Sequence, residues 1–358
     1  MAGQRTILIT GGTGFIASYL AMKLLESDAN TNVVLFDRNP DPRRLQGFKS
    51  SVAGVQDRYT PVKDRITSVQ GDLTHLSHVL ALFETHQPDS VFHLGALLSA
   101  GAETNPTMGF EVDLVGSRHI LEAARLFCQK SAQPPIRVLF PSTIASFGKF
   151  VQSGQLGVPN EAVQMPTTMY GISKVSVERL GEYYTAKTWV DFRAVRFPSV
   201  VGASRGPGGT TVYSTLMIQL PAQGKPYAVY VRQDTPLDII YVADAVAALL
   251  GLHDANNASL KRRVYNIAGI RKAAGQAPLA SDIAAAVTAA LPAAQITFNQ
   301  NDSPIEETVR GFGILDDTAA QQDWSWPATP ADLPTAVNSF VQDVQNYPDR
   351  ILALELFG

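Results

Sequence analysis

The strongest constraint on the fold lies at the start of the chain. Arg5–Thr10 is rich in β-branched residues and predicts a buried strand, and Gly11–Ala17 follows as a glycine-containing turn. A helical pattern of apolar residues comes next, and Asn32–Asp37 predicts a second strand with an acid at its end. The acid stands about 20 residues beyond the turn, which is the arrangement that a dinucleotide site requires. We therefore predict that the chain begins with a strand–turn–helix–strand unit that binds a dinucleotide.

The turn has the pattern G-x-x-G-x-x-A, and each small residue has a physical reason to be there. Gly11 is expected to make the tight turn and Gly14 to let the backbone approach a pyrophosphate, while Ala17 permits the helix to pack closely on the strand. Phe15 and Ile16 begin the helix, whose N-terminus would face the phosphates. We predict that these positions contact the cofactor.

Asp37 indicates which dinucleotide is bound. A carboxylate at the end of the second strand accepts hydrogen bonds from the adenosine ribose and repels a 2′-phosphate, so it favours NAD over NADP. Arg38 is a further candidate for contact with the cofactor. We otherwise interpret Arg38, Arg43 and Arg44 as part of a solvated loop. NAD is therefore the predicted cofactor.

Strands and helices continue to alternate along the chain. Further strands are expected at residues 66–70, 90–97, 137–143 and 192–197, and helices at residues 75–86, 107–130 and 170–188. Such alternation predicts an α/β protein with a doubly wound parallel sheet, the Rossmann fold, in which ligands bind beyond the carboxyl ends of the strands. The residues that follow strand ends should gather along that edge: Gly11, Asp37, Asp72, Leu94 and Thr143. Leu73, Gly95 and Ala96 adjoin them and are predicted to contact the cofactor. Asp72 either bonds the adenine or caps the next helix.

The pattern changes near residue 199, where glycine and proline become frequent and the regular alternation ends. Strands are still expected at residues 237–242 and 263–267 with a helix between them, and amphipathic helices near 280–291 and 329–346. We predict that residues 1–198 form an NAD-binding domain, with residues 237–268 returning to it. Residues 199–236 and 269–358 then form a smaller, mixed substrate-binding region.

Tyr170 and Lys174 carry the predicted chemistry. Four residues apart on a helix, they share one face. A phenol with a pKa of about 10 is a poor base at neutral pH, and a nearby ammonium favours the phenolate and so suits it to general acid–base work. Ser142 and Thr143 place hydroxyls at the end of the fifth strand. A hydroxyl, a phenol and an ammonium are thus expected to converge beside a nicotinamide.

Composition excludes several classes of protein. The chain of 358 residues is 45% apolar and 17% charged, and a net charge of −3 gives no reason to expect nucleic acid or an anionic membrane as a partner. Its one cysteine, Cys128, excludes an internal disulfide framework, and six histidines show no metal-binding pattern. No apolar run approaches the roughly 18 residues that span a bilayer. We expect a cytoplasmic protein that acts on a small molecule.

Together these motifs resemble the extended short-chain dehydrogenase/reductase superfamily over nearly the whole chain. Within it, the chain is similar to the short-chain type of L-threonine 3-dehydrogenase. The motifs that carry this finer resemblance are LGALLSAGA at 94–102, FPSTIASFG at 140–148, TTMYGISKV at 167–175, GPGGTT at 206–211 and DDT at 316–318.

The resemblance implies oxidation of a secondary alcohol on a small hydroxy amino acid by NAD. Tyr170 would take the hydroxyl proton, and Lys174 would lower the pKa of Tyr170 and bind the nicotinamide ribose. Thr143 would hold the substrate oxygen, with Ser142 as the alternative, and Pro198 would lie over the nicotinamide. A homodimer formed through the helices at 107–130 and 170–188 is also implied. The implied pocket for the amino-acid end is lined by Ser99, Thr168, Thr210 and Thr211.

The chain departs from the family pattern at positions that bear on the substrate. Gly95 stands where alanine is usual, Asp113 where Val-Asn-x-x-Gly would give asparagine, and Asp238 where proline is frequent. Glu306–Gly313 lacks an expected tryptophan. An acid at position 113 would alter the path of water or protons.

Three other functions remain open from the sequence. A nucleotide-sugar epimerase or dehydratase would need an arginine for the diphosphate; the segment Leu237–Tyr241 lacks it, although Arg205 or Arg232 could substitute. A dehydrogenase of a sugar acid or another hydroxy acid fits the same hydroxyl-rich loop. A sensor that binds a dinucleotide without chemistry is disfavoured by the complete set of hydroxyl, phenol and ammonium.

Overall fold

The chain folds around one seven-stranded sheet in which every strand is parallel to its neighbours. The computed structural model describes residues 4–149, 157–206, 208–273, 275–298, 304–327 and 331–352. The strand order is β10-β6-β5-β4-β1-β2-β3, so the order reverses between β1 and β4. This confirms the predicted doubly wound sheet. Its strands are β1 (Arg5–Thr10), β2 (Thr31–Asp37), β3 (Ile66–Gln70), β4 (Ser90–His93), β5 (Arg137–Thr143), β6 (Asp191–Phe197) and β10 (Val264–Asn266).

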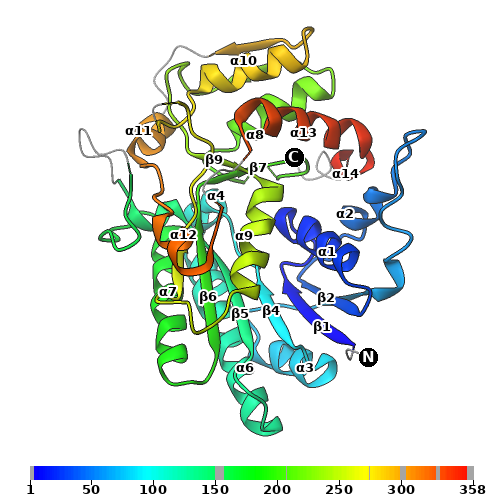
Figure 1. The fold of residues 1–358 in the computed structure, drawn as a ribbon, viewed down its shortest axis with the longest axis vertical. Coiled ribbons are helices and arrows are strands. Elements are labelled where there is room, and N and C mark those ends of the chain that lie inside the picture. Colours follow the sequence, from blue (N-terminus) through cyan, green and yellow to red (C-terminus); the bar gives the residue numbers. More distant parts are fainter. Residues whose placement is uncertain are drawn as a thin grey trace.

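Helices cover both faces of the sheet (Figure 1). On one face lie α1 (Phe15–Ser27) and α9 (Val242–Asp254). On the other face lie α3 (Leu76–His86), α6 (Gly116–Ser131) and α7 (Met169–Ala186). The two faces have separate apolar clusters because strands buried on both sides must be apolar on both sides.

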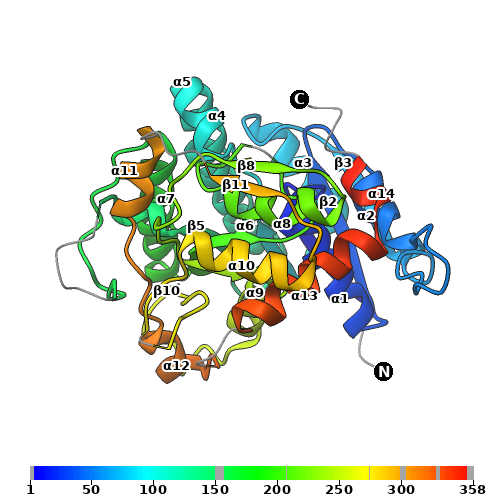
Figure 2. The same ribbon diagram turned by 90° about the horizontal axis from the view of Figure 1, so that it is seen from above.

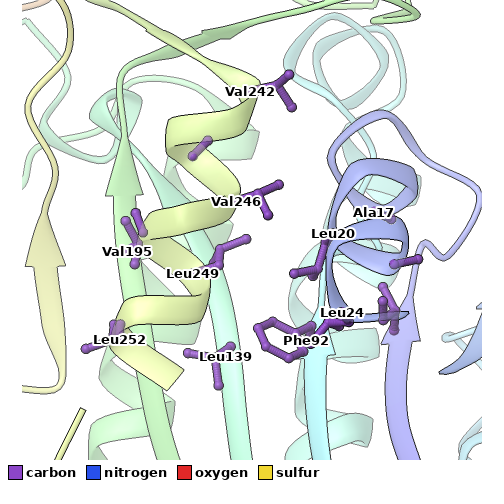
Figure 3. Packing of buried hydrophobic residues seen from close by; sticks show 14 of the residues in the cluster. Ala17, Leu20, Leu24, Phe92, Leu139, Val195, Val242, Val246, Leu249 and Leu252 are labelled. Carbon is purple, nitrogen blue, oxygen red and sulfur yellow. The ribbon is translucent and has the colours of Figure 1, made fainter. Parts of the chain in front are cut away.

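The α1–α9 contact fixes the helix that follows the glycine turn. Figure 3 shows Leu20 and Leu24 of α1 facing Val246 and Leu249 of α9, with Phe92 of β4 beneath them. All five side chains are at most 3% exposed. Burial of each leucine or valine is worth about 1.5–3 kcal/mol, so this packing holds the N-terminus of α1 firmly beside the end of β1.

Two predicted elements differ in detail. The strand expected at residues 90–97 ends at His93, and the residues after it form a turn. The helix expected at 107–130 has the right extent, but it consists of α5 (Pro106–Gly109), a π-helical segment η3 (Phe110–Val115) and α6. Single π-helical turns inside α-helices are frequent at functional sites.

Much of the C-terminal part lies across one end of the strands of the sheet, at the top of Figure 1 and in front in Figure 2. Its core joins α8 (Tyr213–Ala222), α10 (Ala280–Ala290) and α13 (Leu333–Asn346). Within residues 237–268, β10 is a strand of the large sheet and α9 packs on that sheet, whereas β9 pairs with β7 in a sheet of two strands. The remaining strands are β7 (Ser199–Val201), β8 (Tyr227–Val229), β9 (Ile239–Tyr241) and β11 (Ile296–Phe298).

Short helices complete the described chain. None of the helices in the described residues has the length and apolar content to cross a bilayer. The short elements are α2 (Arg43–Gln46), α4 (Ser99–Thr104), α11 (Pro304–Gly311), α12 (Thr318–Trp324) and α14 (Asp349–Leu352), with 3₁₀ turns η1 (Gly47–Lys49), η2 (Lys63–Arg65) and η4 (Ile144–Phe147).

Candidate active site

One cavity of about 570 Å³ runs along the carboxyl ends of the strands. Every residue that the sequence predicted for the site lies on its lining, from the glycine turn to the catalytic helix. On its lining are Gly11, Gly14, Phe15, Ile16, Asp37, Arg38, Asp72, Leu73, Leu94, Gly95, Ala96, Ser99, Ser142, Thr143, Thr168, Tyr170, Lys174, Pro198, Thr210 and Thr211. The topology therefore gathers the predicted residues at one place.

The glycine turn has the geometry of a phosphate cradle. Gly11 has a φ of +62°, and a Cβ there would lie 2.8 Å from the backbone of Gly95. Gly14 donates its N–H to the Gly11 carbonyl at 2.8 Å and immediately precedes α1. Backbone N–H groups and the helix N-terminus thus face a space kept free of side chains, which suits a pyrophosphate. The turn fits a dinucleotide.

Asp37 is held beside this turn. The backbone N–H and the hydroxyl of Thr13 both donate to its Oδ2, at 3.1 and 2.9 Å, and the N–H of Asn39 donates to Oδ1. Thr13 was not predicted; its place inside the turn, facing a strand-end acid, is the only signal for it. The carboxylate is fixed at the lining of the cavity, in the position that an adenosine ribose would need.

The interpretation of Arg38, Arg43 and Arg44 as part of a solvated loop is wrong for Arg44. It lines the cavity and donates to the backbone carbonyl of Ser204 at 2.7 Å, and burial lowers its pKa. Arg43 is exposed and paired with Asp41, as a surface arginine would be. Arg38 is exposed as well, although it reaches the cavity. Arg44 lies at the cavity because it contacts the loop between β7 and α8. The local sequence around Arg44 does not predict that contact.

Asp72 does not cap α3 directly, because His75 occupies the N-cap position. Its Oδ1 accepts hydrogen bonds from the backbone N–H and the hydroxyl of Thr74, at 2.9 and 2.8 Å, and these bonds lower its pKa. His78 Nδ1 accepts the backbone N–H of Asp72. Asp72 thus shapes the turn before α3 and lines the cavity at the same time.

Helix α7, which carries Tyr170 and Lys174, starts at the cavity. Thr168 is its N-cap, and its hydroxyl oxygen accepts the Gly171 N–H at 3.1 Å. Tyr170 follows in the first turn, and Lys174 lies one turn further on the same face. The Lys174 ammonium is 3% exposed and donates to the Pro141 carbonyl at 2.9 Å. It lies 5.3 Å from the centre of the Tyr170 ring.

The two candidate hydroxyls have different surroundings. Ser142 donates its hydroxyl to Glu178, a fully buried carboxylate that is also paired with Arg196. The hydroxyl oxygen of Thr143 accepts the Ala145 N–H at 3.2 Å. A hydroxyl has one proton to donate. Ser142 therefore has its proton committed within the protein, whereas Thr143 has its proton free to point into the cavity.

Burial shifts the pKa values of Tyr170 and Lys174. Burial raises the pKa of Tyr170 well above its usual value, Asp113 raises that pKa further, and the cation that lowers it is Arg205. Lys174, whose ammonium lies 5.3 Å from the centre of the ring, was predicted to lower this pKa, and that effect stays a prediction. Burial lowers the pKa of Lys174 itself to about 8, against the raising effect of Asp113.

Arg205 is the main residue that the sequence analysis did not place here. It was considered only as a substitute ligand for a diphosphate. Its guanidinium donates to the hydroxyls of Ser199 and Thr211 at 3.1 and 3.2 Å and to the Val200 carbonyl at 2.9 Å. Burial lowers its pKa to about 10, and only the tyrosines Tyr230 and Tyr170 act against that change. In the described part of the chain it thus has hydroxyl and carbonyl partners but no carboxylate.

The departures from the family pattern have local explanations. A Cβ at position 95 would lie 2.6 Å from the Cδ1 of Leu73, so the glycine there leaves room for the Leu73 side chain. Asp238 is buried, is paired with Arg271 and accepts the Leu315 N–H at 3.0 Å. Phe312 and Thr308 line the cavity near the segment where tryptophan was expected.

Two pairs of hydroxyl groups on the lining of the cavity are within hydrogen-bonding distance of each other. The hydroxyl of Ser99 is 3.1 Å from that of Thr210, and the hydroxyl of Ser199 is 2.6 Å from that of Thr211. These pairs join α4 and β7 to the loop before α8. In the described residues, no group of three histidine, cysteine, aspartate or glutamate side chains is placed to hold a metal ion.

A parallel sheet whose glycine turn adjoins a strand-end acid, with tyrosine, lysine and threonine on the same cavity, defines an NAD-binding oxidoreductase of the short-chain dehydrogenase/reductase class. Residues 7–268 match the NAD dependent epimerase/dehydratase family. The chain belongs to that family, and its cofactor is NAD.

Individual relatives agree with this class. The chain is 29% identical to the mitochondrial L-threonine 3-dehydrogenase of Bos taurus, over 95% of this chain and 83% of the relative. It is 33% identical to an uncharacterized epimerase/dehydratase of Staphylococcus haemolyticus, over 74% and 76% of the two chains. A solved structure, the GalE-like L-threonine dehydrogenase of Cupriavidus necator in its holo form, is 30% identical and has a TM-score of 0.77, with 94% and 99% of the chains covered.

Proposed function

We propose that this protein oxidises the secondary hydroxyl of a small hydroxy amino acid with NAD, and that L-threonine is its substrate. The observation that carries the proposal is the presence of Thr143, Tyr170 and Arg205 on one cavity. The first two supply a hydroxyl donor and a proton acceptor, and the third supplies a cation without a carboxylate partner among the described residues. The threonine dehydrogenases among the relatives support the same substrate.

The residues divide the work as follows. NAD would be held by the glycine turn and Asp37 on the lining of the cavity, and when bound it would supply the hydride acceptor for the reaction. The Tyr170 phenol oxygen takes the proton of the substrate hydroxyl as hydride leaves the same carbon. The Thr143 hydroxyl donates to the substrate oxygen and fixes its position. Lys174, held by the Pro141 carbonyl, stands beneath the Tyr170 ring and is assigned to the nicotinamide ribose.

Arg205 is assigned to the substrate carboxylate. A guanidinium presents paired N–H donors that match the two oxygens of a carboxylate. The hydroxyls of Ser99, Thr168 and Thr210 offer acceptors for an ammonium group. An amino acid would thus be held at both charged ends, with its β-carbon hydroxyl at Tyr170.

The test is a screen for NAD reduction over L-threonine, D-threonine, 2- and 3-hydroxy acids, sugar acids and UDP-sugars. We expect L-threonine to give the highest kcat/KM. Tyr170→Phe should abolish turnover and leave NADH affinity nearly intact, whereas Tyr59→Phe, which lies off the cavity, should behave as the unchanged protein. Turnover in Tyr170→Phe at the unchanged rate would refute the assignment of the base.

A hydroxy acid or a sugar acid is the second candidate, because Arg205 recognises a carboxylate whether or not an ammonium is present. Preference for 3-hydroxybutyrate over threonine in the same screen would favour it. A nucleotide-sugar epimerase is supported only by Arg205 as a candidate ligand for the diphosphate, because Arg205 lies on the lining of the cavity and Arg232 does not. Conversion of a UDP-sugar without net NADH release would establish that alternative.

We further propose that the chain has the NAD-binding and substrate-binding parts that the sequence predicted. Residues 1–198 with 237–268 hold NAD, and residues 199–236 and 269–358 complete the substrate side. A homodimer through the helices at 107–130 and 170–188 is supported by large apolar side chains exposed there, namely Phe110, Leu126, Ile172 and Tyr183 at 37–51%. Light scattering of the protein and of Ile172→Glu tests the dimer. The cytoplasmic location stays a prediction.

A further inference from the structure

Asp113 is a buried carboxylate with an unsatisfied oxygen beside the catalytic helix. It is 2% exposed and lies in the π-helical segment η3, which packs against α7. Its Oδ1 accepts the Leu97 N–H at 2.6 Å, while its Oδ2 is buried without a hydrogen-bond partner in the described structure. An unpaired buried carboxylate oxygen costs free energy, so its presence at an active site calls for a functional reason.

The charged groups around Asp113 come from three elements. From α7, Lys174 and Tyr170 interact with it electrostatically, and Glu178 acts on Lys174 one turn further along. From the β7–α8 loop, Arg205 acts on Tyr170. From β4, His93 faces Lys174 and has its pKa lowered to about 3, so it stays neutral.

Asp113 affects the pKa values of Tyr170 and Lys174, and Lys174 affects the pKa of Asp113. Burial raises the pKa of Asp113 to about 6, against the lowering effects of Lys174 and the Leu97 N–H. Above that pH the carboxylate is charged. Its charge in turn raises the pKa of both Tyr170 and Lys174, because a nearby negative charge favours their protonated forms.

We propose that Asp113 is a positioning residue for proton transfer whose negative charge, acting through Lys174 and Tyr170, sets the pH above which the phenol accepts the substrate proton. The proposal rests on the proposed function and concerns its regulation by pH. The resemblance implies a neutral asparagine at this position, where this chain has an acid. The charge makes Tyr170 hold its proton more tightly.

The pH dependence of oxidation follows from the proton balance of the reaction. During oxidation the C–H bond of the substrate breaks with hydride transfer to NAD, and its O–H bond breaks with proton transfer to the ionised Tyr170 oxygen. The phenol formed in this way then releases one proton to solvent. The reverse reaction needs a protonated phenol that donates to the ketone oxygen. Asp113 therefore moves the rise of the oxidation rate with pH to more alkaline values.

The experiment compares the pH dependence of kcat/KM for threonine oxidation in the unchanged enzyme, Asp113→Asn and Asp113→Glu. Asparagine keeps the shape and removes the charge, so the alkaline rise should move to lower pH by about one unit. Asp113→Glu should retain the original midpoint. Asp113→Ser is a second neutral variant, expected to shift in the same direction, in case the asparagine protein does not fold. Profiles of the neutral variants that superimpose on the unchanged enzyme would overturn the proposal.

Asp317→Asn is the matched control. Asp317 is 6% exposed, has an unpartnered Oδ2 and a pKa raised by burial, but it does not line the cavity. The same chemical change there should leave the midpoint of the profile in place. A shift in this control equal to that of Asp113→Asn would show a general effect of buried charge and overturn the specific role.

A second readout needs no turnover. The protein carrying ¹³C-labelled lysine is titrated by NMR in the absence of substrate, and Lys174→Met identifies the signal of Lys174. Its midpoint, about 8 in the unchanged protein, should fall in Asp113→Asn. An unchanged midpoint overturns the role of Asp113, whatever the enzyme oxidises. A shifted midpoint with no oxidation of any substrate supports Asp113 and rejects the proposed function instead.

Discussion

Gly11 and Gly95 are in backbone contact at the point where the strand order of the sheet reverses. Gly11 follows β1 and Gly95 follows β4, and a Cβ on Gly11 would lie 2.8 Å from the Cα of Gly95. Gly11 also has a φ of +62°, a conformation that other residues adopt only with strain. Two loops that are far apart in sequence thus close on each other at the phosphate end of the cavity.

Gly11→Ala should weaken NAD binding as well as the fold. The strained φ alone costs on the order of 1 kcal/mol, and the contact with Gly95 must in addition force the two loops apart. Gly54→Ala is the control, because Gly54 has a φ of +79° with no atom within 4 Å of its Cβ. We expect a fall in the unfolding temperature for both, but a loss of NADH affinity of roughly tenfold or more only for Gly11→Ala. Equal NADH binding by the two variants would contradict the close-approach argument.

Asp37 should determine the choice between NAD and NADP. Asp37→Asn keeps the hydrogen-bonding shape and removes the charge that repels a 2′-phosphate, while Arg38 and Arg44 remain near the site. The ratio of kcat/KM for NADP to that for NAD is expected to rise by about tenfold or more. Thr13→Val, which removes only the hydroxyl bonded to Asp37, should keep the preference for NAD. The measurement is the steady-state rate with each cofactor at fixed substrate.

Arg205 should control the binding of the substrate carboxylate. In Arg205→Met the charge is lost, and the KM for threonine should rise about a hundredfold, equivalent to roughly 2–3 kcal/mol. Arg205→Lys keeps a charge without the paired donors, so its KM for threonine should lie between those of the unchanged enzyme and Arg205→Met. NADH affinity measured by fluorescence is expected to change little. A KM unaffected by Arg205→Met would move the carboxylate elsewhere in the cavity.

The alternation of strands and helices was enough to predict the sheet, because each buried parallel strand leaves a local apolar run. The positions of Gly11, Asp37 and Thr143 followed from one general rule, that ligands bind at the carboxyl ends of such strands. The predicted helix at 107–130 was correct in extent. Its π-helical segment was missed, since the periodicity of a single wide turn is lost in a helix of that length.

The residues that were missed depend on contacts between distant segments. Arg44 reaches the cavity only because it bonds Ser204, and Arg205 faces Tyr170 only after the β7–α8 loop has folded over the sheet. The spacing of Tyr170 and Lys174 placed them on one face of a helix, but it carried no information on burial. Burial is what raises the pKa of the phenol and lowers that of the amine.

His93 should make the protein sensitive to acid. Its ring is buried between the hydroxyls of Thr10 and Ser117, with Nδ1 and Nε2 at 2.6 and 2.9 Å from them. Burial and the charge of Lys174 lower its pKa to about 3, whereas an unfolded histidine titrates near 6.5. Between those values the unfolded chain binds a proton that the folded protein does not bind, so stability falls as the pH is lowered from about 6.5 towards 3.

The contribution of His93 to this loss is on the order of 5 kcal/mol over the full range. His93→Gln removes the titrating group, so its free energy of unfolding should fall less steeply with acidification than that of the unchanged protein. Urea unfolding at pH 7.5, 5.5 and 4.5 measures the slope for both. His75→Gln, at an exposed position before α3, should keep the original slope. Equal slopes for the unchanged protein and His93→Gln would mean that carboxylates alone account for the acid sensitivity.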